Sequence, residues 1–112
     1  MKYFISQAMN GRTDEAIKAE RAKVIAAMKK ENPEAEVIDS FFEGAPHDAK
    51  PLWFLGKSFE LLSTADMCVF VGNAPDTARG CALEYKACLV YGIDCCQFDT
   101  ETGHFVATAR GD

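Results

Sequence analysis

Apolar residues occur along the chain in two arrangements: short continuous runs, and longer stretches with an apolar residue at every third or fourth position. The short runs are typical of strands covered on both faces, as in a parallel sheet, and the longer stretches are typical of amphipathic helices. The runs predict strands at residues 3–6, 36–41, 67–71 and 95–98, with a short fifth strand at residues 104–108.

The first of three predicted helices follows the first strand. Thr13 or Asp14 can cap its amino end, because their side-chain oxygens accept hydrogen bonds from free backbone N–H groups. The helix runs to about residue 31, where Asn32-Pro33 stops it because proline cannot continue a helix. Its apolar stripe consists of Ile17, Val24 and Met28, supplemented by alanines.

Two further helices separate the remaining strands. One begins at Pro51, a residue favoured in the first turn of a helix, and the other covers about residues 80–91 and is closed by Gly92. The stripe of the Pro51 helix is formed by Leu52, Leu55, Phe59 and Leu62.

Strands that alternate with helices predict right-handed βαβ units and a single α/β domain over residues 1–112. We expect a three-layer sandwich with a four- to five-stranded, mainly parallel sheet, similar to flavodoxin or Rossmann folds. Ligands of such sheets bind beyond the carboxyl ends of the strands, where the strand order reverses. We therefore expect function to lie on the loops at residues 6–12, 40–50 and 72–80.

Composition and charge narrow the class of protein. The net charge of −5 argues against a nucleic-acid polymer as partner, because such proteins need a basic face. No apolar stretch reaches the roughly 18 residues of a membrane span, and the amino terminus reads as a strand and not as a signal peptide. The five cysteines form no CxxC pair and the two histidines lie far apart. These features favour a cytoplasmic protein with reduced thiols, no metal and no cofactor.

Glu84 is the first candidate for chemistry. It is expected in the first turns of the third helix, at the carboxyl ends of the strands, where the partial positive charge of the helix end would stabilise it as an anion. A rigid carboxylate suits a nucleophile toward an electron-poor sugar carbon. The alternative is an acidic residue that only favours the helix dipole.

Asp66 is the second candidate, because it immediately precedes the apolar run at residues 67–71. If its side chain points toward the crevice, the chain has a second carboxylate for general acid catalysis or for contact with a base. Acidic residues between a helix and a strand also commonly cap backbone groups, and that structural alternative stays open.

The loop at residues 6–12 and the turn before the third helix could bind an anion. Ser6 and Asn10 can donate hydrogen bonds, Gly11 permits close approach of the backbone, and Arg12 can pair with a phosphate. The turn that ends at Arg79-Gly80 resembles an anion-binding turn. Neither segment is a GxGxxG or Walker A motif, so dinucleotide and triphosphate binding are disfavoured. A plain strand-to-helix turn and a solvated arginine are the alternatives.

Taken together, these segments resemble the nucleoside 2-deoxyribosyltransferase superfamily, which includes the 2′-deoxynucleoside 5′-phosphate N-hydrolases. The resemblance covers most of the chain, and the short prophage-type members are the most similar. It is carried by the opening Tyr3-Phe-Ile-Ser-Gln-Ala-Met-Asn-Gly-Arg12, by Ala65-Asp66 before an apolar strand, and by Gly80-x-x-x-Glu84 in a helix that ends Tyr91-Gly92.

The resemblance implies that Glu84 attacks C1′ of a deoxyribose, expels the base and forms a glycosyl ester, which a second base or water then resolves. It implies that Asp66 contacts the substrate near the scissile bond or the base. It also implies a homo-oligomer, whose sites a neighbouring subunit often completes, and no cofactor. The implied substrate-binding residues are Tyr3, Ser6, Gln7, Met9, Asn10, Gly11, Arg12, Arg79 and Gly80.

The chain also departs from the family pattern. Family enzymes often carry a small residue after the nucleophile, whereas Tyr85 stands here, and the chain is shorter than the characterised enzymes. A non-catalytic nucleotide-binding or sensing module of the same fold is therefore the alternative function. A phosphoribohydrolase is disfavoured, because the paired glycines of the PGGxGTxxE signature are missing. Transfer and hydrolysis both remain open.

Overall fold

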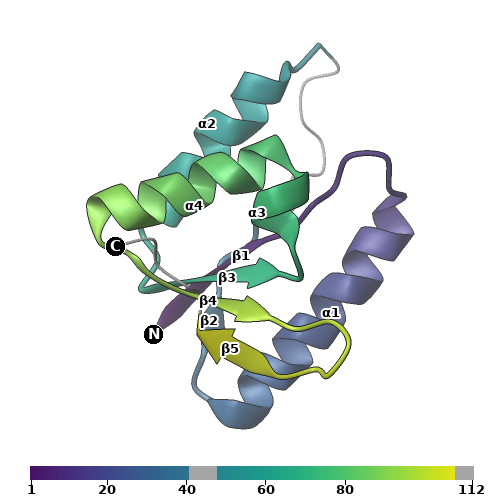
Figure 1. The fold of residues 1–112 in the computed structure, drawn as a ribbon, viewed down its shortest axis with the longest axis vertical. Helices are drawn as coiled ribbons and strands as arrows, with labels where there is room; N and C mark the ends of the chain where they lie inside the picture. The colour runs from purple at the N-terminus through teal and green to yellow at the C-terminus, as the bar shows by residue number, and fades with distance from the viewer. Residues whose placement is uncertain (41–47, 108–112) are drawn as a thin grey trace.

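A computed structural model of the chain describes residues 1–40 and 48–107 and confirms the α/β fold, with helices packed on a five-stranded, mostly parallel sheet (Figure 1). The expected strand at residues 67–71 is present with the same bounds. In chain order the elements are β1 (Lys2–Ser6), α1 (Asp14–Glu31), β2 (Glu36–Val37), α2 (Pro51–Leu62), β3 (Met67–Val71), α3 (Ala74–Thr77), α4 (Arg79–Tyr91), β4 (Asp94–Phe98) and β5 (Phe105–Ala107).

The strands are ordered β2-β1-β3-β4-β5. The first four are parallel and β5 pairs antiparallel with β4. This is the flavodoxin-like order, in which the direction of winding reverses between β1 and β3. The ligand crevice of such a sheet is expected beyond the carboxyl ends of these two strands.

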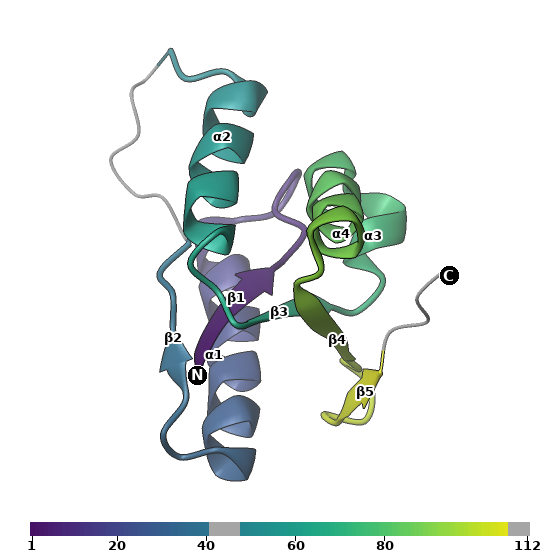
Figure 2. The same ribbon diagram turned by 90° about the vertical axis from the view of Figure 1, so that its left-hand side faces the viewer.

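The helices form a layer on each face of the sheet (Figure 2). Side chains of a strand alternate between the two faces, so Ile5 and Val69 pack toward α1 while Phe4 and Phe70 pack toward α2 and α4. Val24 and Met28 of α1 complete the first apolar cluster, and Leu62 and Cys88 belong to the second. Ser6 follows the parity of Phe4 and therefore faces α2 and α4.

The ends of the helices follow the capping signals in the sequence. Thr13 Oγ1 accepts a hydrogen bond from the Ala16 N–H at the start of α1, and Asn32 ends that helix. Pro51 stands in the first turn of α2. Gly92 closes α4 in the left-handed conformation, with φ of 70°, which an L side chain would adopt only with strain.

Two elements differ from the expectation. The predicted strand at residues 36–41 is paired as β2 only over Glu36–Val37. Just beyond it, Arg21 of α1 donates from Nη2 to the Ile38 carbonyl and to Ser40 Oγ, so these acceptors are bonded to a side chain. Phe41 and most of the expected loop at 40–50 lie outside the described residues. The expected loop at 72–80 contains the short helix α3.

The apolar stripe expected on α2 is only partly buried. Leu62 is the buried residue of this helix, whereas Leu52 is 76 % exposed and Phe59 is also exposed. The physical reason is the position of α2, whose amino-terminal turns extend past the carboxyl ends of the strands (Figure 2). A helical period in the sequence identifies the apolar face of a helix. It does not show over how many turns the sheet buries that face.

Four of the five cysteines are buried, and all five are free thiols. In residues 1–40 and 48–107 no helix is both long and apolar enough to cross a membrane. The same ranges contain no cluster of three or more His, Cys, Asp or Glu side chains that could hold a metal ion.

Candidate functional site

Glu84 lies at the carboxyl end of β1 and is only 5 % exposed. Its Oε1 accepts a hydrogen bond of 2.7 Å from the Ser6 hydroxyl, and the Ser58 hydroxyl is close enough to lower the pKa of the carboxyl group. Ser6 is the last residue of β1, Ser58 belongs to α2, and Glu84 belongs to α4. Three elements that are far apart in sequence therefore meet at one carboxyl group on the face of the sheet that α2 and α4 cover.

Burial raises the pKa of Glu84 to about 7, although the hydrogen bonds from Ser6 and Ser58 lower it. The expectation of a carboxylate stabilised as an anion by the helix end is therefore wrong. Glu84 is in the second turn of α4, and the helix dipole acts mainly within the first turn. Loss of water outweighs the two hydroxyl donors, so near neutral pH the protonated and charged forms are both populated.

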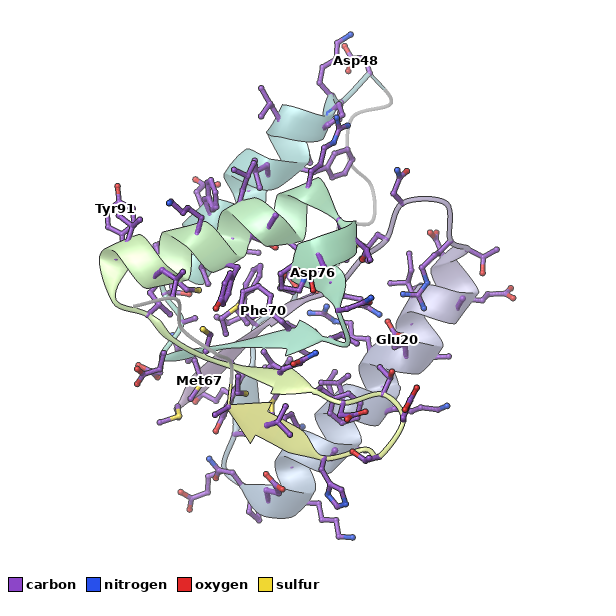
Figure 3. All side chains as sticks on the ribbon, in the orientation of Figure 1. Glu20, Asp48, Met67, Phe70, Asp76 and Tyr91 are labelled. Carbon is purple, nitrogen blue, oxygen red and sulfur yellow. The ribbon has the colours of Figure 1, made fainter. Side chains whose placement is uncertain are left out.

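Within the described residues, uncharged groups surround Glu84. Cys81 lies one turn earlier on α4 and is buried; burial raises the pKa of its thiol to about 11, although the nearby Ser6 hydroxyl lowers it. Tyr85 is half-buried and packs edge-on against Phe70 of β3, with ring centroids 5.4 Å apart. Figure 3 shows Phe70 pointing from the sheet toward α4. Tyr85 therefore fills space under α4 beside the carboxyl group.

Asp66 lies at the other end of the sheet, which corrects the expectation of a shared crevice. Its Oδ2 accepts a hydrogen bond of 2.8 Å from the Lys2 N–H, and its own N–H donates to the Lys2 carbonyl at 2.8 Å. Asp66 precedes β3, and a five-residue strand is about 16 Å long. In Figure 3, Met67 marks the amino end of β3, and Asp76 lies in α3, which follows the carboxyl end of that strand. Asp66 caps the amino end of the sheet.

Tyr3 is also outside the candidate site. It lies at the amino-terminal half of β1, opposite Met67, and packs on the α1 face, where its hydroxyl accepts a long hydrogen bond of 3.5 Å from Asn32. Gln7 is buried but points to the α1 face as well, since its Nε2 donates to Glu20 and to the Ile17 carbonyl.

Arg12 is held by an ion pair. Its Nη1 donates to Glu20 Oε1 at 2.8 Å and to the Ala8 carbonyl at 2.9 Å. Burial opposes the ionised form of Glu20, but the hydrogen bonds from Arg12 and Gln7 and the charge of Arg12 prevail and lower the pKa of Glu20. The guanidinium charge that was expected to meet a phosphate is thus neutralised within the chain.

The remaining expected contacts lie at the rim of the crevice. Met9 is half-buried and Asn10 is exposed. Gly11 has a φ of 75°, so the turn of this loop requires its conformational freedom. Arg79 is exposed at the start of α4, and Gly80 is half-buried beside it.

A cavity of about 130 Å³ lies where the strand order reverses. The cavity borders the α1 face of the sheet, because Glu20 of α1 is one of its lining residues (labelled in Figure 3). Of the expected site residues only Arg12 contributes to it; Glu84 and Ser6 do not. The cavity is lined by Ala8, Arg12, Glu20, Val71, Gly72, Asn73, Ala74, Thr77 and Thr100.

Two polar residues of this region were not expected from the sequence. Ser58 stands in the inward stripe of α2, between Leu55 and Leu62 at helical spacing, and a polar residue in such a stripe is a usable signal. Glu20 stands three residues after the buried Ile17, but its pairing with Arg12 depends on how the first loop folds.

The strand order and the buried carboxyl group beyond β1 define a flavodoxin-like α/β domain with a candidate site at the strand-order reversal. Compared with protein-family models, curated proteins and solved structures, the chain matches none.

Proposed function

We propose that this protein cleaves or transfers the N-glycosidic bond of a deoxynucleoside or a deoxynucleoside 5′-monophosphate, with Glu84 as the nucleophile. The observation that carries the proposal is the buried Glu84 carboxyl group, which the Ser6 hydroxyl holds at the carboxyl end of β1. Perturbed carboxyl groups in the crevice of an α/β sheet are the usual candidates for catalysis. The resemblance to the nucleoside 2-deoxyribosyltransferase superfamily supports the choice of substrate.

In the proposed reaction the Glu84 carboxylate attacks C1′ of the deoxyribose. The C1′–N bond breaks, its electron pair leaves with the base, and the base takes up a proton from water. The resulting glycosyl ester is resolved by water in a hydrolase or by a second base in a transferase. Ser6 keeps the carboxyl group in one orientation, which favours in-line attack.

The 5′ end of the substrate is placed against the first loop. Exposed Asn10 and Gly11 offer a side-chain amide and backbone groups, and Arg79 is exposed at the start of α4, where free backbone N–H groups attract anions. Arg12 joins such a contact only if the phosphate competes with Glu20. We therefore propose a small molecule as the partner of this protein. The proposed location of the protein is the cytoplasm.

The alternative function is a non-catalytic nucleotide-binding module. It is favoured by the position of Asp66, because the carboxyl group expected to assist departure of the base lies at the opposite end of β3. The two functions differ in one observable: the binding module holds a nucleotide without releasing its base.

The test is incubation of the protein with a panel of deoxynucleosides and their 5′-monophosphates, with and without an acceptor base, followed by chromatography of the free base. Glu84→Gln is expected to lower base release by at least about a thousandfold, as loss of a nucleophile does in enzymes of this kind. Its circular dichroism spectrum should match that of the wild type, since the amide keeps the shape of the side chain.

The matched control is Asp66→Asn, which alters a carboxyl group outside the crevice. This variant is expected to retain base release within about twofold while losing some stability. Unchanged turnover in Glu84→Gln rejects the proposed nucleophile. Saturable nucleotide binding without base release in the wild type selects the binding module.

A further inference from the structure

The cavity at the strand-order reversal carries two opposite charges in its wall. Its volume is about 130 Å³, close to that of a cavity of roughly 150 Å³ that holds a benzene ring. Arg12 and Glu20 both line the cavity, and both side chains are partly exposed, so a ligand can reach them. Glu84 does not line it. The cavity can therefore hold a molecule about as large as benzene, apart from the proposed nucleophile.

The ion pair between Arg12 and Glu20 uses only part of each charged group. Every hydrogen bond that joins these two side chains to the described residues is made by Arg12 Nη1 or Glu20 Oε1. A carboxylate has a second acceptor oxygen, and a guanidinium has further N–H donors on its other nitrogens. Because Nη1 and Oε1 are 2.8 Å apart, an unused acceptor and unused donors lie close together in the wall.

The two charges together determine which ligand suits this cavity. An anion is attracted by Arg12 but repelled by Glu20, and for a cation the two effects are reversed. A zwitterion gains from both charges when its ammonium group lies on Glu20 and its carboxylate lies on Arg12. The contact between a guanidinium and a carboxylate can also form two parallel hydrogen bonds, which makes it strong and directional. α-Amino acids carry both groups on one carbon atom, and the smallest of them match the size of the cavity.

The rest of the wall suits the uncharged part of a small amino acid. Val71 and Ala74 are buried apolar residues that line the cavity and can contact a short side chain. Thr77 and Thr100 line it as well and carry hydroxyl groups. The side chain of Thr100 lies beside Gly72, with its Cγ2 3.6 Å from the position that a Cβ of Gly72 would take. The small volume favours glycine, alanine and serine over amino acids with long side chains.

We propose that this cavity binds a small α-amino acid as a zwitterion, with its ammonium group on Glu20 and its carboxylate on Arg12. The inference goes beyond the proposed glycosidic function and does not depend on it, because Glu84 takes no part in the cavity.

The first experiment titrates the isotope-labelled protein with glycine, alanine and serine and follows the backbone amide signals by NMR. Saturable shifts are expected at Gly72, Asn73 and Thr100, with a dissociation constant of about a millimolar or lower, because so small a ligand has few atoms to contribute. Acetate and methylammonium each carry one half of the zwitterion. Each should bind at least about tenfold more weakly than alanine.

The second experiment repeats the alanine titration with variants of the wall. Glu20→Gln and Arg12→Gln each remove one charge, and each should weaken binding at least about tenfold, as loss of a hydrogen bond between charged groups does. Glu31→Gln is the matched control, because it is exposed at the opposite end of α1, and it should bind like the wild type. Thr100→Phe places a ring beside Gly72 and should abolish binding while both charges remain.

Several results would overturn the proposal. One is the lack of saturable shifts at about ten times the expected dissociation constant. Equal binding of alanine and acetate would identify an anion site, and shifts centred on Ser6 and Glu84 would place the ligand elsewhere. Unchanged alanine binding in both Glu20→Gln and Arg12→Gln would also reject the two contacts. None of these measurements involves base release, so they test the amino-acid site separately from the glycosidic function.

Discussion

Glu84 shows how competing effects of similar size set the charge of one side chain. Its burial removes water that would solvate the anion, and the hydroxyl groups of Ser6 and Ser58 return part of that solvation. The balance leaves the pKa of Glu84 at about 7, close to the operating pH of most enzymes. A nucleophile in this state is active only in its ionised fraction, so the proposed base release should increase as pH rises through about 7.

The same balance predicts how stability depends on pH. The folded protein holds a proton on Glu84 up to a pKa of about 7, whereas the unfolded chain releases it near 4.5. The folded state therefore binds more protons between these values, and the contribution of this group to stability is full below pH 4.5 and is lost as pH rises through 7. The loss amounts to roughly 3 kcal/mol.

Urea unfolding of the wild type and of Glu84→Gln at pH 5 and at pH 8 measures this contribution. The free energy of unfolding of the wild type relative to the variant is expected to fall by roughly 3 kcal/mol between the two values of pH, because the amide does not titrate. Glu60→Gln, an exposed substitution on α2, should follow the wild type. Parallel pH dependence in wild type and Glu84→Gln contradicts the burial of a titrating group.

The position of Glu84 near the carboxyl ends of the strands could be predicted from the sequence, whereas the residues that contact its carboxyl group could not. An acidic residue in a helix that follows an apolar strand must lie near the strand ends, so sequence order alone places it. The direction of Asp66 was not fixed, because polar residues flank both ends of a strand and the pattern does not tell which backbone groups they cap. The ion pair of Arg12 was not predicted for a similar reason, because its pairing with Glu20 depends on the path of the loop between β1 and α1.

At the scale of elements, α2 has two halves with different roles. Its carboxyl-terminal half supplies Leu62 to the apolar cluster formed with Phe4 and Phe70, and its amino-terminal half exposes Leu52. The helical period of α2 was predicted correctly. How much of its apolar stripe is buried depends on where the sheet ends, which is a property of the tertiary structure. A tertiary contact also lies just beyond the short β2, where Arg21 of α1 occupies two acceptors.

Truncation of the two leucines should separate these halves. Leu62→Ala is expected to lower the free energy of unfolding by about 2–5 kcal/mol, the range for loss of a buried leucine side chain. Leu52→Ala should change it by no more than about 0.5 kcal/mol, as is usual at exposed positions. Chemical denaturation at pH 7 measures both values. A loss of equal size at the two positions would show that the whole of α2 is packed.

At the scale of the whole molecule, the strand order and the layers follow from general rules of α/β folds. Right-handed crossovers between parallel strands leave few arrangements for three β-α-β units, and the alternation of strands and helices was predicted from the sequence. The sequence did not reveal which apolar residues stay at the surface. The exposed apolar residues of α2 and α4 include Leu52 and Phe59, and Leu83 and Val90, each pair seven residues apart. Tyr91 is 80 % exposed and points outward at the end of α4 (Figure 3).

The homo-oligomer implied by the resemblance stays a prediction, and the exposed apolar residues of α2 and α4 are the positions to test. Light scattering over a range of concentrations is expected to give a molar mass of at least twice the 12.3 kDa of one chain. The double variant Leu52→Glu with Val90→Glu should lower the mass to that of one chain, because buried unpaired charges disfavour association. Val106→Glu, at an exposed valine of β5, is the control and should keep the oligomer. A single-chain mass for the wild type at every concentration rejects the prediction.

The burial of Glu84 has one more consequence. Near neutrality the proton behaves as a second ligand of the protein, because the carboxyl group is close to half-occupied by it. An anion that settles beside this group draws in a proton, and a cation expels one. Affinity for any charged molecule is thereby tied to acidity by thermodynamic linkage, with at most about a tenfold change for each pH unit. A modest shift in the acidity of its surroundings would thus change which molecules the protein retains.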